Sequence, residues 1–108
     1  MFDNGARLAG MLGLCARAGR LITGEKACVQ AIRGGEAFVA LLDGAASANA
    51  VKALGDACAS HSVPLVRTGA YRLGDAIGKP GRMAAAVTDG RMAAKIIELS
   101  DADSIGDA

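Results

Sequence analysis

Apolar side chains are distributed along this chain in two patterns, the helical spacing typical of amphipathic helices and the short continuous runs typical of buried strands. The first helical stretch spans residues 7–18, where four apolar side chains recur at i, i+3, i+4 and i+7. These side chains are Leu8, Met11, Leu12 and Cys15. We therefore expect an amphipathic helix over residues 7–18, ended by Gly19.

Three further segments repeat the helical spacing and carry start or stop signals. Residues 24–33 follow Thr23, whose hydroxyl can cap a helix, and precede the glycine pair 34–35, which can end one. Ser47 and Asp89 can cap two later helices. The side chains predicted to face inward are Ala27, Cys28, Ala31 and Ile32 in the first, Val51, Leu54 and Cys58 in the second, and Met92, Ala93, Ile96 and Ile97 in the third.

Four short segments have the composition of strands. Residues 37–42 form an uninterrupted apolar run, which is typical of a strand covered by helices on both faces, so we expect it at the centre of a sheet. The other expected strands are residues 20–22, 63–66 and 83–87. A short helix at residues 71–77 contains Gly74, which indicates that another element packs closely against its backbone.

The alternation of helices and strands predicts an α/β fold. We expect a three-layer α/β/α sandwich with a central, mixed sheet of about four strands. The 108 residues fit a single domain, residues 1–108, and the 52% hydrophobic content is sufficient for a core, which we place in residues 7–99. Residues 100–108 are polar and acidic, and we expect them to form a frayed tail.

Several classes of function find no support in the composition. Aromatic residues are too few for a base-stacking platform, and the three separated cysteines, with His61 as the only histidine, predict buried thiols and no disulfide or metal site. The sequence contains no catalytic constellation, nucleotide-binding glycine motif, signal peptide or membrane span. We therefore expect a non-enzymatic, cytoplasmic protein with no cofactor, small-molecule substrate or membrane partner.

Charge is distributed unevenly, although the net charge is only +1. Residues 1–35 carry five basic and two acidic residues, and residues 67–97 carry six basic and two acidic residues. The two remaining segments, residues 36–66 and 98–108, are net acidic. Local positive patches steer a polyanion more effectively than net charge does, so this pattern is compatible with RNA binding.

The strongest candidate site is the start of the helix predicted at residues 24–33. A helix N-terminus presents backbone N–H groups to an anion, and Gly24 has no Cβ, so a nucleic-acid backbone could approach closely. Lys26, Gln30 and Arg33 follow along the same helix. An ordinary capped helix has the same signals, so this segment alone leaves both interpretations open.

Several strings, taken together, carry a resemblance to a known family. They are Gly24-x-x-x-x-x-Gln30-Ala-Ile-Arg-x-Gly35, Val63-Pro64, Arg72-Leu-Gly-Asp-Ala-Ile-Gly-Lys79 and Ala86-Val-Thr-Asp89. Over about residues 7–99 the chain resembles the L7Ae/L30e family of ribosomal proteins, most closely its small bacterial YlxQ-like members. The family is known for binding kink-turn RNA. The resemblance implies structured RNA as the partner, with ribosomal RNA and protein partners in translation as candidates.

The resemblance also implies how the RNA would be bound. In the family, the helix start enters the RNA at tandem sheared G·A pairs, and the loop before the last strand covers an extruded base. Gly24 matches the family's Gly-x-Asn-Glu pattern, but Lys26, Ala27 and Gln30 stand where Asn, Glu and Lys are usual. Base-edge reading is thereby weakened, because Lys26 can donate but not accept, and Ala27 has no carboxylate.

Phosphate and shape recognition are what we expect to remain. Backbone N–H groups at the helix start and basic side chains there and in the loop at residues 79–82 would carry it. The predicted RNA-binding residues are Gly24, Glu25, Lys26, Gln30, Arg33, Lys79 and Arg82. The alternative is a protein-interaction module that kept the fold but lost specific RNA binding. An enzyme would need a deep pocket with convergent titratable groups.

Overall fold

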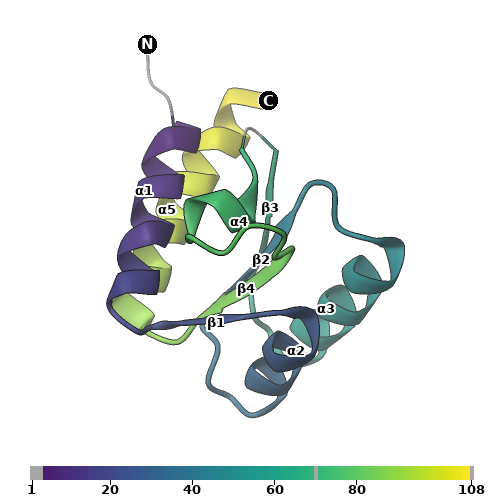
Figure 1. Cartoon of the computed structure of the whole chain (residues 1–108). Helices are drawn as coiled ribbons and strands as arrows, with labels where there is room; N and C mark the ends of the chain where they lie inside the picture. The colour runs from purple at the N-terminus through teal and green to yellow at the C-terminus, as the bar shows by residue number, and fades with distance from the viewer. Residues whose placement is uncertain (1–3, 70, 108) are drawn as a thin grey trace.

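The computed structural model describes residues 4–69 and 71–107, and these form five helices and four strands (Figure 1). In chain order the elements are α1 (Asn4–Arg17), β1 (Leu21–Thr23), α2 (Glu25–Arg33), β2 (Val39–Asp43), α3 (Ala48–His61), β3 (Leu65–Thr68), α4 (Leu73–Ala76), β4 (Ala84–Val87) and α5 (Gly90–Asp107).

The strands form one mixed sheet in the order β1-β4-β2-β3. β4 runs antiparallel to both of its neighbours, whereas β2 and β3 are parallel, because α3 carries the chain back across the sheet between them. Every residue of β2 is buried. The prediction of a mixed sheet with this apolar run in its interior is therefore confirmed.

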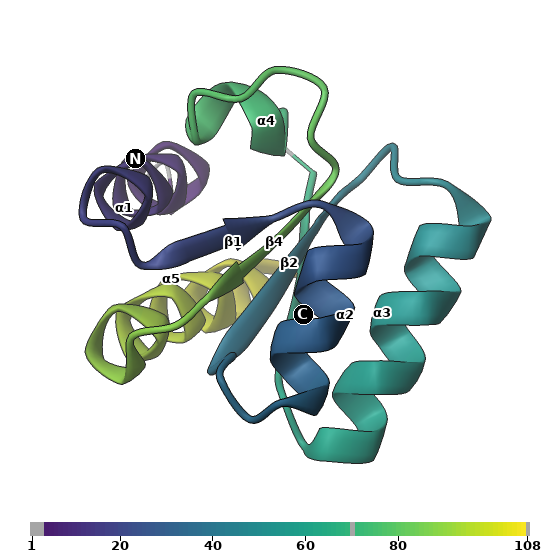
Figure 2. The same ribbon diagram turned by 60° about the horizontal axis from the view of Figure 1, so that its bottom comes forward.

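Helices cover both faces of the sheet, and each face has its own apolar core (Figures 1 and 2). α1, α4 and α5 cover one face, where Leu12 and Leu41 are fully buried. α2 and α3 cover the other, where Ile32 and Leu42 are fully buried. Successive side chains of a strand point to opposite faces, so β2 supplies both cores. The predicted three-layer sandwich is confirmed.

Two of the three predicted side-chain caps are present. The hydroxyl of Ser47 accepts a hydrogen bond from the backbone N–H of Ala50 at 3.1 Å, at the start of α3. Asp89 Oδ1 accepts from the N–H groups of Arg91 and Met92 at 2.9 and 3.1 Å, at the start of α5. Each cap satisfies backbone donors that have no partner within the helix.

The third predicted cap, Thr23, is wrong. Thr23 is the last residue of β1 and pairs with Ala85 of β4. The N-cap of α2 is Gly24, at φ 98° and ψ 143°, with no side-chain hydrogen bond. Pairing with a distant strand holds Thr23 in the extended conformation, and the glycine makes the turn into the helix because positive φ costs it little.

Other details also differ from the sequence prediction, including β3, which spans Leu65–Thr68 where residues 63–66 were expected. Ala27, which was expected to face inward, is exposed, whereas Cys28, Ala31 and Ile32 are buried as predicted. The helical conformation of α5 continues to Asp107, through most of the stretch expected to fray. No proline or glycine interrupts the helical pattern after Gly90 until Gly106, which allows the helix to run on.

The cysteines behave as the sequence predicts, since Cys15, Cys28 and Cys58 are all buried and free. Burial, with a smaller contribution from the nearby thiol of Cys58, raises the pKa of Cys28 to about 12. Such thiols are poor nucleophiles. Of the helices in residues 4–69 and 71–107, none is long and apolar enough to cross a membrane.

Candidate functional site

Gly24 connects the edge strand β1 directly to the start of α2. Its N–H donates to the carbonyl of Ala84 in β4 at 3.0 Å, and its own carbonyl accepts from the N–H of Cys28 at 3.0 Å. The residue therefore belongs to both the sheet ladder and the first helical turn. Because the first N–H groups of a helix lack partners within the helix, this end of α2 presents donors beside the start of β4.

The loop before β4 is a tight turn held against α4. The N–H of Arg82 donates to the carbonyl of Lys79 at 3.1 Å, and Gly81 lies between them at φ 90°. With Pro80 before the glycine, this is the pattern of a type II β-turn. The prediction that residues 79–82 form a tight loop is borne out by this geometry.

Gly74 shows how closely the turn packs. A Cβ built on Gly74 would lie 2.6 Å from the carbonyl oxygen of Lys79 and 2.9 Å from the nitrogen of Gly81. Backbone atoms cannot yield to such a contact as a flexible side chain can. α4 and the turn therefore pack backbone to backbone, as predicted from the glycine inside the short helix.

The turn brings Arg82 to the start of α2. A Cβ on Gly24 would lie 3.0 Å from Arg82 Nη1, so the guanidinium rests where any larger residue would place a side chain. Gly24 and Arg82 belong to segments about sixty residues apart, and the antiparallel pairing of β1 with β4 brings them together. Two basic segments of the sequence thus meet at one edge of the sheet.

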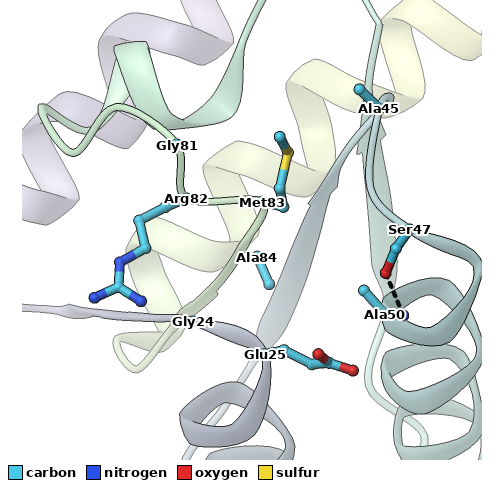
Figure 3. A pocket seen from close by; sticks show the side chains of 9 residues that line it. All are labelled: Gly24, Glu25, Ala45, Ser47, Ala50, Gly81, Arg82, Met83 and Ala84. Atoms are coloured by element: carbon cyan, nitrogen blue, oxygen red, sulfur yellow. Dashed lines mark hydrogen bonds between the residues drawn. The ribbon is translucent and has the colours of Figure 1, made fainter.

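A hollow of about 400 Å³ opens at this edge (Figure 3). Its wall is formed by the start of α2, the turn before β4 and the start of α3, with Ser47 near one side and the carboxylate of Glu25 pointing into the space between the two helices. The residues that line it are Gly24, Glu25, Ala45, Ser47, Ala50, Gly81, Arg82, Met83 and Ala84. Two helix N-termini border the hollow, and its lining carries one cation, Arg82, and one anion, Glu25.

A second hollow of about 330 Å³ also borders the turn and shares Ala45, Gly81, Arg82 and Met83 with the first. Beneath it lies Asp43, only 5% exposed, whose carboxylate accepts from the N–H groups of Ala45 and Leu73, both at 2.8 Å. These two hydrogen bonds lower the pKa of Asp43 more than its burial raises it. Asp43 therefore joins the end of β2 to the start of α4.

Two arginines stand around Asp43. The charges of Arg72 and Arg67 lower its pKa further, by less than the backbone hydrogen bonds do. Arg72 lines the second hollow, and Arg67 Nη2 donates to the carbonyl of Gly44 at 3.2 Å. The lining of the second hollow thus contains two arginines, Arg72 and Arg82, and two aspartates, Asp43 and Asp75.

The structure separates the predicted site residues into two groups and leaves Lys79 apart from both. Gly24, Glu25 and Arg82 line the first hollow together. Lys26, Gln30 and Arg33 are exposed and share one face of α2 by their spacing, with Arg33 in the last turn, roughly 12 Å along the axis from the helix start. Lys79 is exposed on the turn but does not line either hollow described above.

Sequence reasoning missed four residues at this edge. From the sequence, Ser47 was predicted only as a helix cap and Asp43 only as the end of a strand. An acidic residue directly after a buried apolar run could have indicated that Asp43 has a role at the edge of the sheet. Arg72 was part of the recognised motif without a role, and Met83, 40% exposed, was assigned to a strand. Their proximity depends on strand pairing between distant segments, which local patterns do not reveal.

Comparison with known proteins identifies the family to which the sequence is similar. The family model for the ribosomal protein L7Ae/L30e/S12e/Gadd45 family matches residues 6–97. The chain is similar to the RNA-binding protein YlxQ of Bacillus subtilis (strain 168), with 38% identity over 92 residues, covering 84% of this chain and 92% of that protein.

Two solved structures are similar as well. One, a protein with unknown function from Bacillus halodurans C, superimposes with a TM-score of 0.84 at 36% identity, covering 89% of this chain and 98% of that one. The other, the Giardia lamblia 15.5kD RNA binding protein, gives a TM-score of 0.73 at 15% identity, covering 94% and 92% of the two chains. At that identity the second likeness shows a shared fold alone.

Proposed function

Because the chain belongs to the ribosomal protein L7Ae/L30e/S12e/Gadd45 family, we propose that it is a non-enzymatic RNA-binding protein that recognises structured, kink-turn-like RNA. The proposed binding edge consists of the start of α2 and the turn at residues 79–82. The printed name of its Bacillus subtilis relative, RNA-binding protein YlxQ, supports RNA as the ligand. Ribosomal RNA is one candidate, and the cytoplasm is the compartment we expect.

One observation carries the proposal: Arg82 Nη1 lies 3.0 Å from the position that a Cβ on Gly24 would take. The helix start, which offers backbone donors, and the turn, which offers a guanidinium, therefore form one continuous surface. A phosphate group there would receive N–H bonds from the helix and a charge-assisted bond from Arg82. Such contacts position an RNA without reading its bases.

Shape provides the specificity in this proposal. Ala27 is exposed on α2, where it offers no acceptor to a guanine amino group, and Lys26 only donates. An RNA that is bent sharply can contact α2, the turn and the start of α3 together, whereas a straight duplex reaches fewer of them. Double-stranded RNA is in general recognised mostly by its shape and by contacts to phosphates and 2′-hydroxyls.

The remaining residues have supporting roles. Lys26, Gln30 and Arg33 extend a polar face along α2 and would follow the RNA backbone away from the bend. Lys79 adds charge beside Arg82, and Met83 offers an apolar surface to an unstacked base. Glu25 is negatively charged, so it would repel a phosphate. In the first turn of α2 its carboxylate instead stabilises the helix by interacting with the helix dipole.

The proposal is tested by the salt dependence of RNA binding. Each phosphate contact made by a lysine or arginine contributes a slope of about −0.9 to log K against log salt for duplex-like nucleic acid. The Lys26→Ala/Arg33→Ala double variant should bind kink-turn RNA more weakly and with a slope shallower by up to about 2, and Arg82→Ala should lose about one unit.

Lys52→Ala is the matched control, because Lys52 is an exposed cation on α3 that pairs with Asp56 at 3.5 Å. It should leave the slope nearly unchanged. If the double variant and Arg82→Ala keep the affinity and salt dependence of the unaltered chain, the proposed edge is wrong. If the unaltered chain binds no RNA at micromolar concentration, the interaction module becomes the better account.

A further inference from the structure

A groove between α1 and α5 lies on the opposite layer of the sandwich from α2 and α3, where the proposed RNA contacts begin (Figures 1 and 2). Its volume is about 440 Å³. The lining residues are Arg7, Gly10, Met11, Leu14, Arg17, Lys95 and Leu99. Nothing in the proposed RNA-binding function uses this surface.

The floor of the groove is apolar and its rim is basic. Leu14 is 49% exposed there, while Leu99, at 8%, belongs to the core beneath. Among the described residues that line the groove, three are cations and none is acidic. α1 itself contains two arginines and no acidic residue. Lys95 is paired with Glu98 at 3.6 Å, but both side chains are more than half exposed, so the pair is weak.

Gly10 adds a second, independent observation. The other glycine in the middle of α1, Gly13, has a packing reason, because a Cβ there would lie 3.3 Å from the carbonyl oxygen of Ala76. Gly10 is exposed, and a Cβ on it would meet nothing within 4 Å. Glycine in a helix interior lowers helix stability, and the fold of this chain does not require it at this position. A glycine in the floor of a groove allows a partner to approach the helix backbone closely.

We infer that the α1/α5 groove binds an acidic amphipathic helix of a partner protein. The apolar side chains of the partner would pack on Leu14 and over Gly10, and its carboxylates would face Arg17 and Lys95 on the rim. Because this surface is separate from the RNA-binding edge, the chain can hold RNA and such a protein together.

A synthetic peptide serves as the probe. It is an amphipathic helix of about 18 residues, long enough for five turns, with leucines on one face and glutamates flanking them. A matched peptide carries lysines in place of the glutamates, and a scrambled one distributes the leucines around the helix. Affinities are measured by fluorescence anisotropy with the full chain, and the binding surface is mapped by amide chemical-shift changes.

The acidic peptide should bind at least about tenfold more tightly than the lysine and scrambled peptides, with shift changes confined to α1 and α5. Leu14→Ser and Arg17→Ala should each weaken it several-fold, whereas Lys52→Ala, which removes an exposed cation from α3, should not. Gly10→Ala should raise the midpoint of thermal unfolding yet weaken peptide binding, a combination that general destabilisation cannot produce.

Several results would overturn the inference. They are equal binding of the acidic and lysine peptides, shift changes outside the groove, or unchanged affinity in Leu14→Ser and Arg17→Ala. Unchanged peptide affinity in Gly10→Ala would show that the partner helix does not approach the backbone of α1 closely at Gly10. Concentration-dependent shift changes in α1 and α5 without peptide would show that the groove joins two copies of this chain instead. RNA binding can fail without affecting any of these outcomes.

Discussion

Gly74 holds the turn at residues 79–82 against α4, so it controls the position of Arg82. Replacing it with alanine places a Cβ 2.6 Å from the carbonyl oxygen of Lys79, and the turn must move. We predict that Gly74→Ala lowers the free energy of unfolding by about 1–3 kcal/mol and weakens RNA binding, measured by denaturant unfolding and an RNA titration.

Gly55→Ala is the control for that substitution. Gly55 lies within α3, and a Cβ there meets nothing within 4 Å, so alanine should stabilise the chain by about 0.5–1 kcal/mol through helix propensity. If Gly74→Ala were as stable as Gly55→Ala, the tight packing of the turn on α4 would be disproved.

Asp43 connects the end of β2 to the start of α4 through two backbone hydrogen bonds. Asparagine has only one acceptor oxygen and no charge, so Asp43→Asn should lower the free energy of unfolding at pH 7 by about 1–3 kcal/mol. Circular dichroism during urea unfolding measures this loss. An Asp43→Asn variant that unfolds at the same urea concentration as the unaltered chain would contradict the assigned role.

The same contacts predict a pH dependence with a definite sign. The folded-state pKa of Asp43 is lowered below its ordinary value of 3.8, so its contribution to stability is fully present above about pH 4. It is lost as the pH falls through the lower, folded-state pKa. The stability difference between Asp43→Asn and the unaltered chain should therefore shrink in acid, and a difference that grows there would rule out this assignment.

At the scale of single elements, one predicted helix cap is present in the structure and another is not, because pairing with a distant strand overrides the local signal at the second. Ser47 caps α3 with a 3.1 Å hydrogen bond, so Ser47→Ala should cost about 1 kcal/mol. Thr23 forms no cap, so Thr23→Ala should not incur that loss and should cost less than Ser47→Ala. Thermal unfolding of both variants measures these losses of stability. An equal loss for the two variants would indicate that Thr23 also acts as a helix cap.

The elements themselves are largely encoded by local patterns. Periodic apolar residues place α1, α2, α3 and α5, and the unbroken apolar run before Asp43 identifies the buried strand, because burial requires those side chains wherever the strand pairs. Thr23 is the exception. Its hydroxyl resembles a cap in sequence, but hydrogen bonding to β4, more than sixty residues later, keeps it in a strand.

At the scale of the whole molecule, the candidate site was only partly predictable. Gly24 and Arg82 were each identified from local signals and a family resemblance, but their proximity depends on the pairing of β1 with β4. Asp43 and Ser47 join the same edge because β2 and α3 end and begin there. Residue types indicate which chemistry is available, whereas non-local packing decides which of those residues meet.

The molecule also carries two candidate binding surfaces that share no lining residue. We propose the edge at the start of α2 for RNA phosphates and the groove between α1 and α5 for an acidic helix, and the two hollows have different lining residues. Substitutions in one should leave binding at the other intact. Substitutions at the RNA-binding edge can therefore be tested without altering peptide binding in the groove.

The most direct test of the central claim compares two RNAs. The chain is titrated with a kink-turn RNA and with a copy whose sheared G·A pairs are replaced, so that the sharp bend is lost while the number of phosphates is kept. We predict binding at least about tenfold tighter, or about 1.4 kcal/mol, to the bent RNA. Equal affinity for the two RNAs, or no binding to either, would contradict recognition of the bent backbone by α2 and the turn beside it.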